Sequence, residues 1–273
     1  SIYLKARWLD QFSDYTTTLD TFYTSPTRDK KESEAHFMHT LNYYDYSHSV
    51  LNGYQIVKLP FAETSSLSMI FVLPQADEEL EEVTSTQLVT SLDSLVSTRI
   101  ALALPKFKFE STYDDNLKES LMQLGVVAPF TGNALCGIFD TKTYNNCESL
   151  IIDKIIQKTV IDVNEKGVEA AAVTAAMVSP TSMGPPITDV PIKMILDHPF
   201  QFYIYDSDEE LVLFEGRLGE PKVPEDEPEV TLFDGEHSST EFWSSTFGVD
   251  PTDLPEYIET EEGEGIENTT SIA

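Results

Sequence analysis

Residues 163–188 read VNEKGVEAAAVTAAMVSPTSMGPPIT, and the conformation of this stretch decides the fold. It begins like a strand, continues through alanines and small polar residues, and ends in Gly-Pro-Pro. From residue 170 to residue 188 it carries no charged side chain, although the chain of 273 residues has a formal net charge of −30. Alanine favours a helix, but β-branched residues interrupt any helical run. These residues are Val168, Val173, Thr174 and Val178.

As a strand, the stretch would divide into two faces because side chains alternate. One face would hold only small or apolar side chains: Val168, Ala170, Ala172, Thr174, Ala176 and Val178. The opposite face would carry the single charge, Glu169. Gly167 stands at the base of the stretch and offers a backbone pivot. The stretch is compatible with a helix, a loop and a strand, which is the pattern expected of a segment with two alternative states.

The rest of the chain up to residue 221 predicts mainly strands, in short runs rich in apolar, β-branched or aromatic residues. The runs are residues 1–8, 54–61, 67–74, 100–111, 155–163, 200–205 and 211–218. The spacing of leucines predicts two helices, at residues 86–96 and 114–125. We therefore expect an α+β fold in which strands dominate.

The composition excludes several classes of partner. The chain has 47 acidic residues against 17 basic ones, so its surface should repel nucleic acid, anionic lipid and heparin-like polymers. No apolar run approaches the ~20 residues of a membrane span. Two cysteines, Cys136 and Cys147, indicate neither a disulfide framework nor a zinc site. We expect no nucleic acid, membrane or heparin partner.

Enzyme chemistry has no support in the sequence. His36 and His39 are the only close histidine pair, and they lack the glutamate of the HExxH zinc motif. The sequence contains no GxSxG elbow, no phosphate-binding glycine loop and no dinucleotide fingerprint. We expect no enzyme activity, no metal site and no cofactor.

The end of the chain differs in composition. Residues 220–273 contain sixteen Asp or Glu and a single Lys, Lys222. Such a segment buries too little surface to offset the entropy of ordering. We expect a domain at residues 1–221 followed by an acidic disordered tail at residues 222–273. The aromatic residues of the tail could be short docking motifs, but the expectation is a solvated tail without a specific partner.

Several motifs, taken together and in order, make the chain resemble the serpin family from residue 1 to about residue 221. EKGVEAAAVT (165–174) resembles the hinge of the serpin reactive centre loop. Six further segments resemble family motifs: YLKARWLDQF (3–12), LPFAETSSLSMIFVLP (59–74), LPKFKFESTYDDNLKESLMQLGV (104–126), ALCGI (134–138), DHPFQFYI (197–204) and LFEGRLGEP (213–221). The resemblance implies a multi-sheet serpin fold.

The resemblance also implies a mechanism. A serine protease attacks the exposed loop as a substrate and forms an acyl-enzyme. The freed hinge then inserts into the main sheet as a new strand, and the attached protease is distorted and trapped. The chain would therefore be a suicide-substrate inhibitor of a serine protease.

The family pattern assigns roles along a loop at about residues 165–191. Counting from the hinge puts the reactive bond at Thr181–Ser182, with Met183–Gly184 and Met177–Val178 as alternatives. The hinge residues are Glu165, Gly167, Val168, Glu169, Ala170, Ala171 and Ala172. Trp8 corresponds to the breach tryptophan, and Gln157 stands where many members carry a shutter histidine. No Lys or Arg lies between residues 167 and 192, so the target should be elastase-, chymotrypsin- or subtilisin-like rather than trypsin-like.

Departures from the family leave an alternative open. The N-terminal half of the family, with most of its helices and two strands of the main sheet, does not precede residue 1, so we expect an N-terminally incomplete fold. Gln201 stands where the family is usually apolar. The alternative function is a non-inhibitory serpin-like binding protein or an inactive truncated remnant. The family resemblance favours an extracellular location over a cytoplasmic one.

Overall fold

The structure is a computed structural model, and it describes only part of the chain. The described residues are 2–25, 32–62, 66–75, 78, 80–113, 116–131, 135, 151–168, 190–222, 243, 246–249 and 254. Both cysteines and residues 169–189 lie outside this part.

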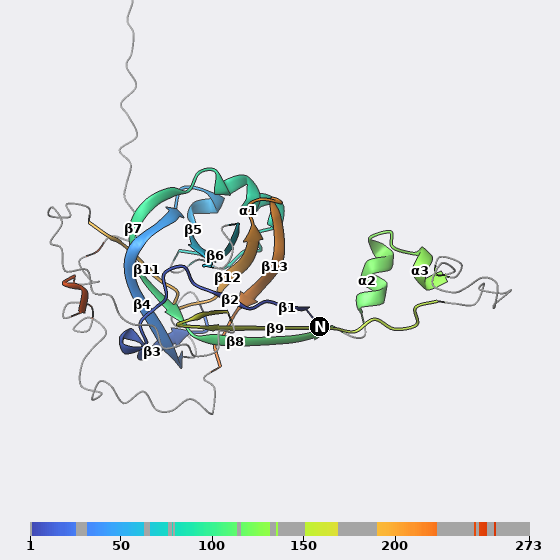
Figure 1. The fold of residues 1–273 in the computed structure, drawn as a ribbon, viewed down its shortest axis with the longest axis horizontal. Helices are drawn as coiled ribbons and strands as arrows, with labels where there is room; N and C mark the ends of the chain where they lie inside the picture. Colours follow the sequence, from blue (N-terminus) through green and yellow to red (C-terminus); the bar gives the residue numbers. More distant parts are fainter. Residues whose placement is uncertain are drawn as a thin grey trace, which may run out of the picture.

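A five-stranded sheet, here called the small sheet, contains the start of the 163–188 stretch. Its strands are β1 (Ile2–Tyr3), β2 (Ala6–Arg7), β8 (Phe107–Tyr113), β9 (Gln157–Asn164) and β10 (Gly167–Val168). β9 is central: β8 runs antiparallel to it on one side, and β1 (parallel) and β10 (antiparallel) pair with it as well. β10 also pairs with β2, so it lies between β2 and β9. Figure 1 shows β8 and β9 as long strands running along the base of the molecule.

An eight-stranded sheet, here called the large sheet, forms most of the body. Its strands are β3 (Thr18–Tyr23), β4 (Glu32–Ser47), β5 (Gln55–Pro60), β6 (Leu67–Leu73), β7 (Val96–Pro105), β11 (Ile192–Ile195), β12 (Phe200–Asp206) and β13 (Leu211–Leu218). The order is β11-β7-β4-β5-β6-β12-β13, and β3 pairs with the first part of β4. The sheet curves strongly around the body in Figure 1.

The core lies where the two sheets meet. Phe107 of β8 packs against Phe200 and Phe202 of β12, with ring centroids 6.0 and 5.3 Å apart. Phe71 of β6 extends the cluster through Phe200. Gln201, the polar departure from the family pattern, is satisfied because its Oε1 accepts a 3.0 Å hydrogen bond from the amide of Val83. Phe109 of β8 also packs edge-to-face on Phe202, so the two aromatic residues at alternate positions 107 and 109 both point into this core.

The helices are short and peripheral. α1 (Ser85–Leu92) starts with a capping box formed by Thr84 and Gln87. α2 (Leu117–Gln123) and α3 (Ala128–Thr131) lie beyond the far end of β8 and β9 in Figure 1. The described residues also contain two 3₁₀ turns, η1 (Asp14–Thr16) and η2 (Leu51–Gly53). Across the described residues, no helix combines the length and the apolar character needed to cross a bilayer.

The prediction of an α+β fold dominated by strands is confirmed. Three strands, β3, β4 and β11, were not predicted, and β10 lies in the stretch whose conformation the sequence left open. β4 was missed because polar residues interrupt its apolar and aromatic ones without a regular period, and its centre reads as a histidine pair. In a strand, residues three apart point to opposite faces, so His36 and His39 do not form a site together. The helix predicted at 86–96 ends at Leu92, and residues 93–95 connect it to β7, which begins at Val96.

The tail differs from expectation at the few positions that the structure describes. Trp243 is 1% exposed and belongs to the main apolar core, and Phe247, Val249 and Leu254 pack against that core. For these four residues the expectation of a solvated tail is wrong, because their apolar side chains bury surface on the body. The domain boundary and the disorder of the rest of the tail stay predictions.

His39 makes the stability of the fold sensitive to acid. Burial lowers the pKa of His39 to about 3, whereas the ring titrates near 6.5 in an unfolded chain. The folded chain therefore binds fewer protons than the unfolded chain between these values. The stability that depends on the neutral His39 ring is fully present above about pH 6.5 and is lost as the pH falls toward 3. By about pH 4 the free energy of unfolding should have fallen by roughly 3 kcal/mol.

The test is to compare the original chain with His39→Gln in denaturant unfolding across this pH range. Because glutamine does not titrate, the variant should be less stable at neutral pH but flatter between about pH 6.5 and 4. Parallel pH profiles for the two chains would show that His39 is not the group responsible.

Candidate functional site

The candidate site lies at the end of the small sheet where β9 turns into β10. Trp8, which follows β2, is 1% exposed and stacks on Phe61 with ring centroids 5.0 Å apart. Its indole Nε1 donates a 2.9 Å hydrogen bond to the carbonyl of Asn164, the last residue of β9. Its backbone amide donates to the carbonyl of Lys166 at 3.0 Å. Trp8 therefore bonds the β9–β10 turn, which precedes the predicted loop, to the end of β2, the strand that pairs with β10 on the side away from β9.

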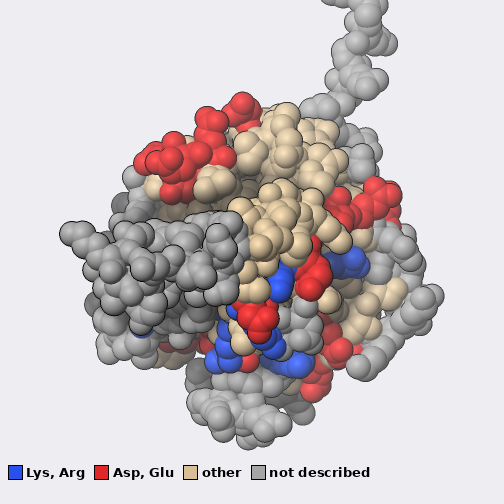
Figure 2. Space-filling model, turned by 90° about the vertical axis from the view of Figure 1, so that its right-hand side faces the viewer, with Lys and Arg blue, Asp and Glu red and all other residues tan. Residues whose placement is uncertain are grey.

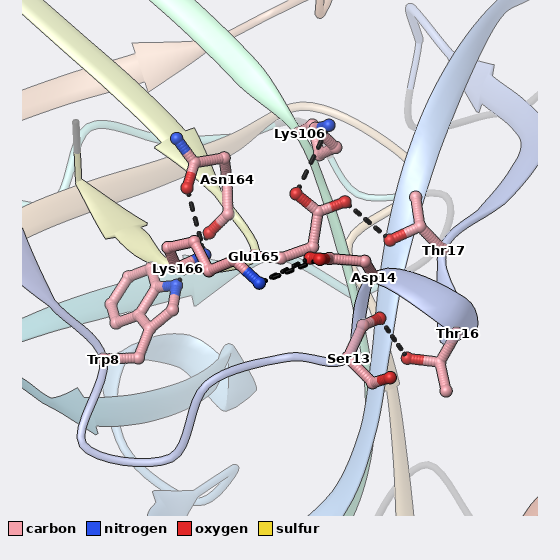
Figure 3. Close-up of polar contacts among 9 residues, drawn as sticks. All are labelled: Trp8, Ser13, Asp14, Thr16, Thr17, Lys106, Asn164, Glu165 and Lys166. Atoms are coloured by element: carbon pink, nitrogen blue, oxygen red, sulfur yellow. Dashed lines mark hydrogen bonds and ion pairs between the residues drawn. The ribbon is translucent and has the colours of Figure 1, made fainter. Parts of the chain in front are cut away.

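Glu165 is the buried charge of the site. Its carboxylate Oε1 accepts a 2.7 Å hydrogen bond from the hydroxyl of Thr17, and its Oε2 lies 3.3 Å from Nζ of Lys106. The carbonyl of Glu165 accepts a hydrogen bond from the amide of Phe12 at 3.0 Å. Figure 3 shows the carboxylate between Lys106 and Thr17. The side chains of Glu165 and Lys106 are 11% and 12% exposed, so the pair is poorly screened by solvent.

The other residues of the turn are held from the solvent side. Nζ of Lys166 lies 2.9 and 2.8 Å from the two carboxylate oxygens of Asp14. The amide of Lys166 donates to the side-chain Oδ1 of Asn164 at 3.0 Å, which closes the turn. Gly167 has φ +146°, and a Cβ there would lie 2.1 Å from the carbonyl oxygen of Ala6. This position therefore requires glycine for both conformation and space.

Val168 is fully buried and is the last described residue before the loop. It lies opposite Ala6 of β2 and Val163 of β9 in two antiparallel ladders. The last described residues before the predicted loop thus form a strand inside the small sheet. The exposed residue Val190 is the first described residue after the loop, and it precedes β11.

The structure brings together some of the predicted site residues. Trp8, Glu165, Gly167 and Val168 are neighbours at one end of the sheet. Gln157 is half-buried opposite Tyr113 at the other end of β9, roughly 20 Å away at the rise of a strand. The remaining predicted residues lie outside the described part of the chain: Glu169, Ala170, Ala171, Ala172, Thr181, Ser182, Met183 and Gly184.

Sequence reasoning missed the partners of the hinge. Lys106, Thr17, Asp14 and Asn164 hold the turn, and none of them carries a motif that distinguishes it from a surface residue. Thr17 is 148 residues from Glu165 in the chain, so only the fold brings the two together. One weak signal was present: Lys106 interrupts the long apolar run between β7 and β8.

The surface near the small sheet mixes both charges. Figure 2 shows acidic side chains over several separate parts of one face, with the basic side chains in its middle and lower parts. Lys158 contacts Glu110 at 2.6 Å, and Lys108 contacts Asp162 at 3.4 Å. On β8 and β9 these lysines therefore face acidic side chains across the strand pair.

Comparison with known proteins identifies the fold. Residues 1–221 match the family model described as serpin (serine protease inhibitor). The chain is 30% identical to intracellular coagulation inhibitor 2 of Tachypleus tridentatus, over 81% of this chain and 51% of that protein. It is also 30% identical to the leukocyte elastase inhibitor of Bos taurus, over 81% of this chain and 57% of that protein.

A solved structure agrees with these sequence matches. The crystal structure of Serpin48 of Tenebrio molitor, described as a highly specific serpin, superimposes with a TM-score of 0.59 and 30% identity, covering 80% of this chain and 54% of that one. The chain thus spans about half the length of the relatives it matches. Since the family match covers most of the chain and follows the strands described above, the chain belongs to the serpin family.

Proposed function

We propose that this chain is the loop-bearing part of a serine protease inhibitor that acts as a suicide substrate. The observation that carries the proposal is β10. The residues directly after the hinge turn already pair with β2 and β9 inside the small sheet. A loop that starts as a central strand and continues, after Glu169, with small uncharged residues has an insertion path that begins in the uncut chain.

The register of β10 defines that path. β10 is antiparallel to both neighbours, so the following residues would continue between β1 and β9. Continuing the two ladders puts Ala171 between Tyr3 and Val160, which pair with each other in the uncut chain. Insertion would replace the short parallel ladder between β1 and β9 by two antiparallel ladders. About a dozen new ladder hydrogen bonds plus buried side chains would stabilise the inserted state by on the order of ten kcal/mol.

The proposed target is an elastase-, chymotrypsin- or subtilisin-like protease. The absence of Lys and Arg between residues 167 and 192 gives a trypsin-like pocket nothing to bind. One relative is named for leukocyte elastase. The relatives are longer than this chain, and the activity of the whole protein is part of the proposal.

Elastase should cleave the chain within residues 169–189, near Thr181–Ser182, and trypsin should spare that interval. The reason is the side chain that each protease pocket accepts. Mass spectrometry of the two fragments identifies the cleaved bond directly, and Met183–Gly184 is the alternative cleavage site. Primary cleavage by elastase outside this interval would contradict the assignment of the loop.

Insertion can be detected by a disulfide. In a background with Cys136→Ser and Cys147→Ser, the pair Tyr3→Cys and Ala171→Cys should form a cross-link rapidly after loop cleavage and slowly before it. The two residues become direct cross-strand neighbours only in the inserted state. The matched control is Tyr3→Cys with Val190→Cys, which lies after the loop and should not cross-link.

Non-reducing gels before and after elastase treatment report the result. Equal cross-linking before cleavage would mean that the loop is already inserted. No cross-linking after cleavage would remove the insertion step from the proposal, whichever protease is the target.

A further inference from the structure

Trp243 lies outside the residues that match the family, yet it is one of the most buried residues of the structure. It is 1% exposed, in a part of the chain where acidic residues dominate. Its ring lies 4.8 Å from the ring of Phe247, and its edge-to-face partner on the body is His39, at 5.2 Å and 84°. Full burial of an indole indicates a specific binding surface rather than a passing contact, and we call the surface under Trp243 the seat.

The seat is built by three adjacent strands of the large sheet. His39 of β4 lies opposite Ala103 of β7, and Ala103 lies opposite Ile195 of β11. The three side chains therefore form one row across the sheet, on the face that Trp243 covers. The small side chain of Ala103 in the middle leaves room for a large ring above it.

The rim of the seat ties β3 to the end of β11. The amide of Tyr23 donates a 2.7 Å hydrogen bond to the carbonyl of Asp197. The hydroxyl of Thr18 lies 2.8 Å from Nε2 of His39 and orients the ring that meets the indole. A cavity of about 210 Å³ remains beside Trp243, lined by Asp20 and Asp197 among others. The indole is thus covered without filling the space around it.

We propose that this face of β3, β4, β7 and β11 is a docking site for the chain's own C-terminal extension, with Trp243 as the anchor. The docked extension braces β11, which is the edge strand of the large sheet and pairs only with β7 among the described strands. β11 is also the first strand after the loop at residues 169–189. The extension is therefore placed to stabilise the strand to which the loop returns.

The charges predict how docking responds to salt. The extension is acidic, and the carboxylates of Asp20 and Asp197 lie at the rim of its seat. Like charges oppose docking, and the apolar contacts of Trp243 and Phe247 favour it. Added salt screens the repulsion and leaves the apolar contacts intact, so docking should strengthen as salt rises from about 0.01 to 0.5 M.

The fluorescence of Trp243 tests the docking. The chain has two tryptophans, so the difference spectrum between the original chain and Trp243→Phe isolates this residue. We expect emission at shorter wavelength than that of a peptide of residues 238–256, and slower quenching by acrylamide. The emission should not change on dilution. Peptide-like emission would overturn the docking, and a shift on dilution would show that the seat is filled by a second copy instead.

Hydrogen exchange tests the bracing of β11. Trp243→Ala should raise the exchange rate of the amides in β11 at least about tenfold and leave β9 unchanged, because a local support of β11 is lost. The matched control is Tyr15→Ala, which removes an aromatic side chain that is 63% exposed. Unchanged exchange in β11, or an equal rise in β9, would overturn the bracing. Neither readout depends on a protease, so both stand apart from the proposed inhibition.

Discussion

Glu165→Lys is expected to destabilise the chain by at least about 3–5 kcal/mol, or a fall in Tm of roughly 10 °C. The variant would put a second ammonium group against Lys106 at a place where both side chains are almost fully buried. It would also remove the acceptor of the Thr17 hydroxyl. Thermal and denaturant unfolding measure the effect.

The charge-swapped double variant, Glu165→Lys with Lys106→Glu, is the control for this prediction. It restores an attractive pair and should recover part of the loss. Lys108→Glu serves as the exposed comparison, because the Lys108–Asp162 pair is 56% and 31% exposed and should be worth less than about 1 kcal/mol. A double variant no more stable than Glu165→Lys alone would show that the ion pair does not hold the hinge.

Val168→Arg is expected to turn an inhibitor into a substrate. Val168 is fully buried in β10 of the uncut chain, so an arginine there should leave the sheet before cleavage, and insertion would then have to bury its charge at the first step. Loop cleavage by elastase should continue at a similar rate, because the bond near Thr181 is distant in sequence. The fraction of protease held as covalent adduct should fall at least about tenfold, which corresponds to 1.4 kcal/mol in the partition between insertion and hydrolysis.

Val190→Arg is the matched control, since it places the same charge on the other side of the loop at a residue that is 61% exposed. It should keep the adduct fraction of the original chain. An unchanged adduct fraction in Val168→Arg would mean that the strand position occupied by β10 is not the entry point of the loop.

The sequence predicted those strands whose residues are apolar enough to be recognised singly. β5, β6, β9, β12 and β13 coincide with the runs identified from β-branched and aromatic residues. β4 was missed, since polar residues interrupt its apolar ones without a regular period and its 16 residues pair with three different neighbours. Which of its side chains are buried depends on those neighbours, and only the assembled sheet shows it.

The candidate site was predictable only in part, because only some of its residues belong to a local sequence motif. The motif around Glu165 and the tryptophan at position 8 carried the family resemblance, and the structure brings them together. The partners of Glu165 come from elements distant in the chain, and no local pattern predicts such contacts. Trp243 was treated as part of an acidic tail because composition averages over a segment, whereas one buried indole needs only one complementary surface.

The most direct test of the account is covalent trapping. The protein, together with any residues that precede Ser1 in it, is incubated with elastase-, chymotrypsin- and subtilisin-like proteases and separated on denaturing gels. The account predicts, with at least one of them, an adduct whose mass is the sum of the protease and the inhibitor cut near Thr181–Ser182, because the acyl bond survives when the loop inserts. Cleavage of the loop without any adduct across the three protease classes would contradict it and would favour a non-inhibitory serpin.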